Sequence, residues 1–564
     1  MNVSRREALG LGALGALGVA GLTLPMAGSG VEAASISKLA PRNMPKPYGV
    51  KLVRPPVLPF ADMEDKDGRY RLYTVTEQAG LASIVPGLKT PVFGYNAIAP
   101  GPTIRVPQNM RVKLRVRNQL PALNPISGET FNTSTHLHGS ASLPQYDGYA
   151  DDVAHKDDYK DYWYPNWQPA RTLWYHDHNV HTTAQNAYSG LAAQYHLTDR
   201  AERELLPQGH YDVPLTITDA MFAANGSLAY DDNSHSGLWG DVILVNGRPW
   251  PVLQVKRKIY RFRVLNASIA RSLRLRLSNG APLVMVATDG GLMPKARPVA
   301  DYRHAGAERY EWLVDFSQYP VGTTIDLQNL SNKNNVDYDN TNKVMRFEVV
   351  ADTALPPDSA ASKTLSQMPD TLVSSDAMSL TSADSTGSFY MRLERDDVTN
   401  QFQISGKSWE DVQASGHQAL LTRVQPDQVQ MWTVENRTGG GWFHPLHIHL
   451  VDFQIFSRNG RAPFDYERGP KDVVYVGEDE TVKLLMKFTL QKGGGNTVNA
   501  GGRYMVHCHN LPHEDHDMMH QFAVGDPAVN DPILAAPCKE DYGEYPDDGW
   551  PYGSGDGSGD TADA

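Results

Sequence analysis

Hydrophobic and polar residues alternate along short stretches of the chain. The pattern is regular at residues 111–117 (Arg-Val-Lys-Leu-Arg-Val-Arg) and 259–264 (Ile-Tyr-Arg-Phe-Arg-Val). A period of two is typical of a half-buried β-strand, whose side chains point alternately to the core and to solvent. The chain also contains 48 glycines and 38 prolines, which end strands and form turns. The pattern therefore predicts an all-β protein made of short strands in antiparallel sandwiches.

The length of 564 residues favours three or four domains. The segment 354–388 is rich in Ser, Pro, Asp and Thr, and we interpret residues 356–384 within it as a linker. The segment 542–564 consists mainly of Gly, Asp and Ser and predicts a disordered tail.

The N-terminal residues 1–34 resemble an export signal. Arg5 and Arg6 form a twin-arginine motif, and an apolar Gly/Ala-rich stretch follows. The small residues that end at Ala34 resemble a signal-peptide cleavage site. A membrane anchor is the alternative, but the glycines and Pro25 in the stretch favour a cleaved signal. We therefore expect export by the twin-arginine route to a periplasmic, cell-wall or extracellular location, without a stable membrane anchor.

Net charge and cysteine content bear on two questions, whether the protein binds nucleic acid and whether disulfide bonds stabilise its fold. The formal net charge of −12 gives no support for a nucleic-acid partner. Only two cysteines are present, Cys508 and Cys538. If Cys508 binds a metal, no intramolecular disulfide can form, so Cys538 is a free or intermolecular thiol and the fold depends on core burial. We expect a monomer.

Residues 507–518 carry a dense set of metal-binding side chains, His-Cys-His-Asn-Leu-Pro-His-Glu-Asp-His-Asp-Met. On a β-strand the two histidines beside Cys508 would point to one face and Cys508 to the other, so one strand would serve two metal sites. A returning loop would bring His513 and Met518 to the Cys508 sulfur. Cysteine, histidine and a weak thioether are typical ligands of a blue-copper electron-transfer site.

Three further segments contain two histidines separated by one residue. They are His136 with His138, His176 with His178, and His447 with His449. On a strand such a pair presents both imidazoles to one side, which suits a chelate. With the pair around Cys508 this gives eight histidines, which suit three metal ions, two with three imidazoles and one with two. His444 lies three residues before His447, so it faces away from that pair and is assigned to the Cys508 site.

Two simpler interpretations compete with this one. A single His-x-His pair is usually accidental, and its histidines often belong to a polar network. A structural zinc site would favour several cysteines or a closed set of four ligands, whereas only one cysteine lies among these histidines. Four pairs with a cysteine inside one of them favour copper.

The four histidine segments resemble the four copper motifs of the multicopper oxidases, within which the chain is most similar to the bilirubin oxidases and bacterial spore-coat laccases. Three stretches resemble the bilirubin oxidases in particular, namely 135–140 (Thr-His-Leu-His-Gly-Ser), 171–178 (Arg-Thr-Leu-Trp-Tyr-His-Asp-His) and 507–519. Segments 239–250 and 337–347 also resemble that group, although they carry no metal ligand. The resemblance covers most of the chain after the signal.

The resemblance implies three cupredoxin-like Greek-key β-sandwich domains, which we place at 45–205, 206–355 and 385–535. The histidine pairs fall in the first and third domains, so we expect the trinuclear cluster at their interface. The resemblance also implies four copper ions. The type 1 copper would be bound by His444, Cys508, His513 and Met518, the type 2 copper by His136 and His447, one type 3 copper by His138, His176 and His509, and the other by His178, His449 and His507.

The resemblance further implies a four-electron reduction of O2 to two waters, coupled to one-electron oxidation of a small organic donor such as bilirubin, a phenol or an aromatic amine. Asp147 and Glu514 match acidic positions that the family uses for proton delivery, although each could instead orient an imidazole. Trp442 and Asn510 lie two residues from type 1 ligands, on the expected substrate side, although Trp442 could serve only for packing. The alternatives are a cuprous or other metal-ion oxidase for copper tolerance and a non-catalytic structural protein.

Overall fold

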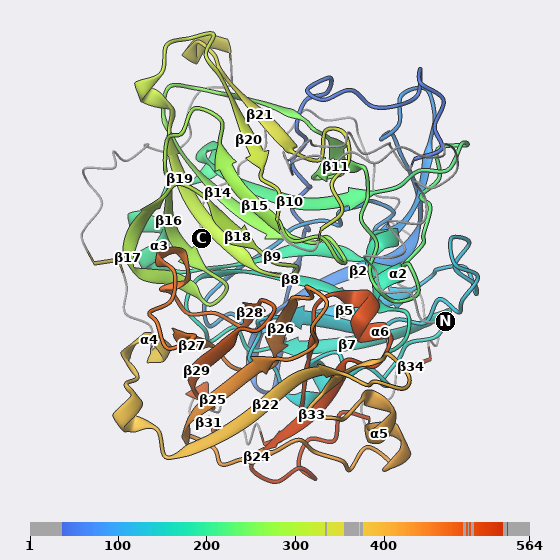
Figure 1. Ribbon diagram of the computed structural model, residues 1–564, viewed down its shortest axis with the longest axis vertical. Coiled ribbons are helices and arrows are strands. Elements are labelled where there is room, and N and C mark those ends of the chain that lie inside the picture. The colour runs from blue at the N-terminus through green and yellow to red at the C-terminus, as the bar shows by residue number, and fades with distance from the viewer. Residues whose placement is uncertain are drawn as a thin grey trace, which may run out of the picture.

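The computed structural model describes residues 37–332, 335–354, 371–372, 376–488 and 501–533, with short segments at 492–493, 496–497 and 538–539. Its regular structure is mainly β-strand and forms three units, each built from two sheets (Figure 1). The predicted all-β fold is confirmed. The export signal, most of the linker and the tail are predictions that fall outside the described residues.

The first unit combines a six-stranded sheet, ordered β1-β2-β5-β7-β34 with β3 beside β2, and a four-stranded sheet, ordered β4-β9-β8-β6. Tyr73 and Leu114 of the first sheet share a buried core with Leu173 and Leu197 of the second. The strands are β1 (Ala61–Asp65), β2 (Gly68–Ala82), β3 (Thr90–Tyr95), β4 (Ile104–Pro107), β5 (Val112–Asn118), β6 (Thr135–His138), β7 (Asp158–Tyr164), β8 (Arg171–Asp177), β9 (Ala192–Thr198) and β34 (Cys538–Lys539).

The middle unit, green to yellow in Figure 1, combines sheets ordered β12-β11-β10-β14-β19-β16-β17 and β13-β21-β20-β15-β18. Phe262 and Trp312 of one sheet pack in one core with Leu327 and Phe347 of the other. The strands are β10 (Asp212–Ala220), β11 (Val242–Val245), β12 (Arg248–Pro249), β13 (Val252–Val255), β14 (Ile259–Asn266), β15 (Leu273–Leu277), β16 (Leu283–Thr288), β17 (Gly291–Val299), β18 (Tyr302–His304), β19 (Arg309–Asp315), β20 (Thr324–Asn329) and β21 (Lys343–Val349).

The third unit, orange to red in Figure 1, combines sheets ordered β23-β22-β25-β29-β27 and β24-β33-β32-β26-β28. Trp432 and Val434 of one sheet share a core with Leu446 and Val506 of the other. The strands are β22 (Gly387–Arg395), β23 (Phe402–Ile404), β24 (Arg423–Val424), β25 (Val429–Asn436), β26 (His444–Ile448), β27 (Phe453–Arg458), β28 (Val473–Val476), β29 (Thr481–Lys487), β32 (Gly502–Cys508), β33 (Met519–Val524) and the separate pair β30 (Lys492–Gly493) and β31 (Asn496–Thr497).

Helices are short and connect strands. They are α2 (Thr183–Ser189), α3 (Arg200–Leu205), α4 (Asp376–Ser379), α5 (Trp409–Ala414) and α6 (Leu511–Asp515). The described part of the chain contains no helix long and apolar enough to cross a membrane.

The sheets are mixed, which corrects the expectation of purely antiparallel sandwiches. Each unit contains parallel strand pairs, among them β5 with β2, β14 with β10, and β25 with β22. Between the two members of each of these three pairs the chain forms a strand of the opposite sheet, β4, β13 or β24. A strand that returns after such a crossover can run parallel to its neighbour. Alternation reports which face is buried and says nothing of strand direction.

The two alternating segments differ in how they are buried. Burial alternates along β5, as predicted. Every residue of β14 is buried, so the prediction of a half-buried strand at residues 259–264 is wrong. The reason is that Arg261 and Arg263 form ion pairs inside the protein, with Glu311 and Asp212 at 2.8 Å from the two Nε atoms. The face of β14 that carries these arginines is therefore buried, although its charged residues are typical of a solvent-exposed face.

Candidate metal centres

Cys508 lies beside two imidazoles in the third unit. It is the last residue of β32, which pairs with β26, and His444 is the first residue of β26. The Cys508 Sγ lies 3.4 Å from the His444 Nδ1 and 3.7 Å from the His513 Nδ1, and these nitrogens are 3.3 Å apart. A soft sulfur and two imidazole nitrogens thus converge on one point, which suits copper.

The chain returns to Cys508 through a helix, where the sequence suggested a loop. Helix α6 carries His513, and the Met518 N–H donates to the His513 carbonyl at 2.9 Å. The Cys508 N–H donates to the Met518 carbonyl at 3.0 Å, and both side chains lie in one buried cluster. The structure thus brings together the four residues of what we call the Cys508 centre, His444, Cys508, His513 and Met518.

The buried position keeps the free side chains of this centre neutral. Burial raises the pKa of the Cys508 thiol far above its ordinary value and lowers the pKa of His444 to about 3. The main-chain N–H of Asn510 donates a hydrogen bond to the Cys508 sulfur at 3.4 Å. A thiol in such a place becomes a thiolate when a cation replaces its proton.

The eight paired histidines meet between the first and third units. β6 pairs with β8 so that His136 lies opposite His176, and β26 pairs with β32 so that His447 lies opposite His507. Each strand pair therefore presents its histidines together. We call this set the histidine centre, and all its members are buried: His136, His138, His176, His178, His447, His449, His507 and His509.

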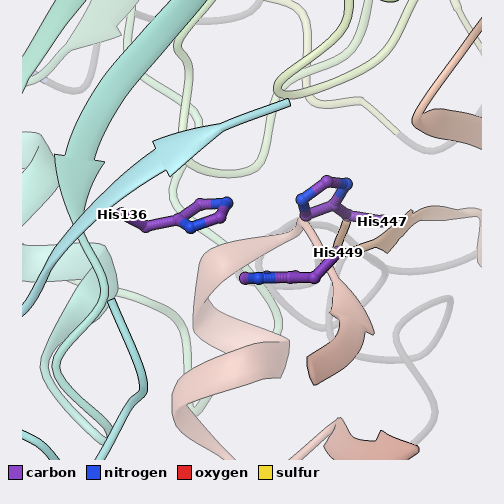
Figure 2. Close-up of side chains that lie close together, drawn as sticks. All are labelled: His136, His447 and His449. Atoms are coloured by element: carbon purple, nitrogen blue, oxygen red, sulfur yellow. The ribbon is translucent and has the colours of Figure 1, made fainter. Parts of the chain in front are cut away.

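Imidazoles from the two units face one another at short range. Figure 2 shows His136 of the first unit opposite His447 and His449 of the third, and each offers a nitrogen within 4.8 Å of the others. In a second group the Nε2 atoms of His178 and His449 each lie 3.2 Å from the His507 Nε2. His449 belongs to both groups, so the groups are contiguous.

The remaining imidazoles form a third group around Trp174. The ring centroids of His138, His176 and His509 lie 5.1, 5.2 and 5.8 Å apart. The Trp174 ring stacks on His176 at 4.0 Å and lies 5.5 Å from both other rings. This buried tryptophan therefore covers the centre on one side, a contact that the local sequence pattern did not predict.

The nitrogens of the histidine centre fit bound cations. Burial lowers the pKa of His176 to about 3 and that of His178 to about 4, so these two imidazoles are neutral and keep a lone pair. The other ring nitrogen can be hydrogen-bonded to the surrounding protein. The Nδ1 atoms of His176 and His447, for example, contact the main-chain carbonyls of Asp177 and Asp472. An unpartnered buried nitrogen is costly unless a metal takes its lone pair. Six such atoms are present in the histidine centre: His136 Nε2, His138 Nδ1, His176 Nε2, His178 Nδ1, His447 Nε2 and His509 Nε2.

The two predicted carboxylates each contact the histidine centre. The Asp147 Oδ2 lies 2.8 Å from the His449 Nδ1, and burial raises the pKa of Asp147 well above its ordinary value. The Glu514 Oε2 lies 2.7 Å from the His507 Nδ1. Burial raises the pKa of Glu514, but the imidazoles of His507 and His178 outweigh it and lower this pKa to about 2. The two carboxyl groups thus favour opposite protonation states.

The predicted substrate-side residues lie next to His513 but are nearly covered. The Trp442 and His513 ring centroids are 5.2 Å apart, and the Asn510 Nδ2 lies 3.0 Å from the His513 Nε2. Trp442 is 6% exposed and Asn510 is 2% exposed. Phe402 and the Ser236 carbonyl also contact His513, at 4.2 Å between rings and 3.2 Å to the Nε2. Neither contact follows from local spacing, because both residues come from distant segments.

Asp472 is another residue that the sequence did not reveal. It lies beside His138 and His447, close enough to form a possible metal-binding group with them. No spacing rule connects it to a histidine motif, because it directly precedes a separate strand, β28.

Comparison with known proteins agrees with the metal-binding geometry described above. Two family models described as multicopper oxidase match residues 77–202 and 391–528. The chain is 39% identical over 470 residues to bilirubin oxidase of Albifimbria verrucaria, covering 80% of this chain and 76% of that protein. It is 32% identical over 485 residues to a laccase of Bacillus subtilis, covering 78% and 91%.

A solved structure agrees in fold. The McoA multicopper oxidase of the hyperthermophile Aquifex aeolicus aligns with a TM-score of 0.72 at 26% identity, over 84% of this chain and 99% of that chain. The predicted resemblance and cupredoxin-like architecture are confirmed. The chain belongs to the multicopper oxidase family, whose members are copper-dependent oxidoreductases that use O2 as the acceptor.

Proposed function

We propose that this chain couples four one-electron oxidations of a small organic donor to the reduction of O2 to two waters. Copper would supply one-electron redox chemistry at the Cys508 centre and dioxygen chemistry at the histidine centre. The observation that carries the proposal is the continuity of the centres. Cys508 belongs to one, and its direct chain neighbours His507 and His509 belong to the other. The peptide itself is a short covalent path for electrons.

We assign four copper ions to these residues. The Cys508 centre would hold the type 1 ion through His444, Cys508, His513 and Met518. The histidine centre would hold the type 2 ion through His136 and His447, and the type 3 ions through His138, His176 and His509 and through His178, His449 and His507. The unpartnered nitrogens support this assignment, as do the short distances within the two groups His178, His449, His507 and His138, His176, His509.

Asp147 and Glu514 are proposed to move protons at the histidine centre. Two carboxyl groups whose environments move their pKa values apart can serve as acid and base. Asp147 favours its protonated form at the His449 Nδ1, and Glu514 its ionised form at the His507 Nδ1. Each contact also orients an imidazole, so the variants described in the Discussion test proton transfer separately from positioning.

We propose bilirubin, phenols or aromatic amines as donors, because the relatives quoted above are named bilirubin oxidase and laccase. Oxidation of cuprous or another metal ion is less favoured, since the 17 methionines are scattered along the sequence. A non-catalytic structural role is disfavoured because no predicted ligand is missing.

Steady-state assays of the copper-loaded protein test the function. Bilirubin, a methoxyphenol and cuprous ion are offered separately while oxygen uptake and peroxide are recorded. We expect faster turnover of an organic donor, one O2 consumed for every four electrons and no peroxide. Peroxide as the main product would contradict the four-electron reaction, and faster turnover of cuprous ion would favour the metal-oxidase alternative.

We further propose export by the twin-arginine route and a monomeric state. The mass of the mature protein tests the first, because cleavage near Ala34 removes the twin-arginine segment. Sedimentation equilibrium tests the second.

A further inference from the structure

Asp472 contacts imidazoles of both units that form the histidine centre. Its Oδ1 lies 3.1 Å from the Nε2 of His138, which comes from β6 of the first unit. Its main-chain carbonyl accepts a hydrogen bond at 2.8 Å from the Nδ1 of His447, which comes from β26 of the third unit. The carboxylate is fully buried, so no solvent competes for these contacts. One residue therefore fixes the orientation of two candidate ligands.

A guanidinium of the middle unit holds this carboxylate. Arg309, the first residue of β19, donates from Nη1 to the Asp472 Oδ1 at 2.7 Å and from Nη2 to the Oδ2 at 2.5 Å. Its Nε donates at 2.9 Å to the carbonyl of Thr172 in the first unit. The bidentate geometry is directional, so Arg309 fixes the position of the carboxylate in addition to balancing its negative charge. The side chain contacts all three units.

Asp289 fixes the backbone on both sides of this pair. Its Oδ1 accepts from the Arg309 N–H at 2.7 Å, and its Oδ2 accepts from the Asp472 N–H at 3.2 Å. The same Oδ2 lies 2.9 Å from the Nζ of Lys471. All these charged groups are buried. Burying so many charges is expensive, so the network is better explained by a geometric task than by stability.

Gly139, directly after His138, leaves the space that the ion pair occupies. Its φ is +87°, and a Cβ there would lie 2.5 Å from the Arg309 Nη2 and 2.6 Å from the Asp472 Oδ2. The His-x-His-Gly sequence therefore has a packing reason. The glycine lets the guanidinium and carboxylate reach the outer edge of the His138 ring.

Asp472 could itself be a metal ligand, since its carboxylate lies near both His138 and His447. The contacts argue against this. Both oxygens already accept hydrogen bonds from Arg309, and the positive guanidinium beside them disfavours a second cation. Moreover, His138 turns its Nε2 to Asp472 and leaves its Nδ1 without a partner.

We infer that Arg309 and Asp472 are positioning residues of the histidine centre, through which the middle unit, which supplies no ligand of its own, controls copper binding. Asp472 accepts a hydrogen bond from the His138 Nε2–H and so fixes the tautomer whose Nδ1 faces the centre. Arg309 fixes Asp472. The inference rests on the proposed function, because it requires His138 and His447 to bind copper.

The test compares copper retention in Arg309→Lys and Asp472→Asn with that of the parent protein. Lysine keeps the charge but loses the bidentate fork, and asparagine keeps the shape but loses the charge. Copper-loaded proteins are dialysed against increasing chelator concentrations and analysed by mass spectrometry, type 2 electron paramagnetic resonance and blue absorption. We expect histidine-centre copper to be lost at about 10- to 100-fold lower chelator concentration, with a shifted type 2 signal. The blue absorption should persist.

Arg263→Lys is the matched control. Arg263 is equally buried, lies in the neighbouring strand β14 and pairs with Asp212 at 2.8 Å, away from the histidine centre. We expect it to retain copper like the parent. Parent-like retention and an unshifted type 2 signal in Arg309→Lys would overturn the inference, as would equal copper loss in Arg263→Lys. If Asp472→Asn does not fold, Arg309→Lys decides alone. A parent protein without a type 2 signal contradicts the proposed function, and the inference with it.

Discussion

The two candidate centres differ in how much of the molecule builds them. The Cys508 centre takes its four residues from one unit, and its donor atoms converge through two paired strands and one short helix. The histidine centre takes strands from two units, and the Arg309–Asp472 pair adds the middle unit. The first can form when one sandwich folds, whereas the second requires the packed interface. We therefore expect the centres to be separable by mutation, although they are joined through one peptide.

The largest expected effect comes from Cys508→Ser. Loss of the thiolate should remove the blue charge-transfer absorption and abolish donor oxidation, because electrons lose their entry point. Most copper of the histidine centre should stay bound, since its ligands are unchanged. Absorption spectra and copper analysis measure both. A variant that stays blue would show that the assignment of the Cys508 centre is wrong.

Asp147→Asn and Glu514→Gln should each slow O2 reduction by about 100-fold or more, because a neutral isostere cannot pass protons. The blue absorption and copper content should persist. Reoxidation of the reduced protein by O2 gives the rate directly. Asp515→Asn is a control, because that neighbouring carboxylate accepts from the amides of Thr183 and Ala184 at 2.8 Å. If copper were lost together with turnover, Asp147 and Glu514 would be orienting groups.

Gly139→Ala should damage the histidine centre and spare the Cys508 centre. The new Cβ would collide with the Arg309–Asp472 pair, so copper should be lost from the histidine centre while the blue absorption remains. Backbone strain at φ +87° adds about 1–3 kcal/mol. Gly128→Ala separates the two costs, because Gly128 has the same φ of +87° and no atom within 4 Å of the added Cβ. Equal copper loss in both variants would attribute the effect to strain alone.

Trp442→Ala should have the smallest effect on electron transfer and a selective one. We expect the substitution to reduce the turnover of bilirubin and bulky phenols more than it reduces the turnover of ferrocyanide. The reason is that a planar donor would lose its aromatic contact beside His513. Trp432→Ala is the control for packing, since Trp432 is buried among Phe389, Phe488 and Phe522 in the same unit. Equal losses for all donors in Trp442→Ala would mean that Trp442 acts on the copper site and does not recognise the donor.

Local spacing was sufficient to predict the candidate ligands and the class of fold. A His-x-His pair on a strand places both rings on one face whatever the rest of the chain does, and a cysteine inside such a pair must face the other way. The offset of three between His444 and His447 separates two sites by the same rule. Alternation along β5 likewise reports a buried face. These inferences need only geometry that is set within a few residues.

Contacts between distant segments were decided only by the tertiary structure. The His138–Asp472 contact joins residues 334 apart in sequence, and the Arg309–Asp472 pair joins residues 163 apart. Neither has a local period, so no pattern in the chain predicts them. The buried arginines of β14 mislead sequence reasoning for the same reason, because their partners come from other elements. The chain alone determines which atoms can bind metal, and the packing of the three units determines which of their nitrogens face the centre.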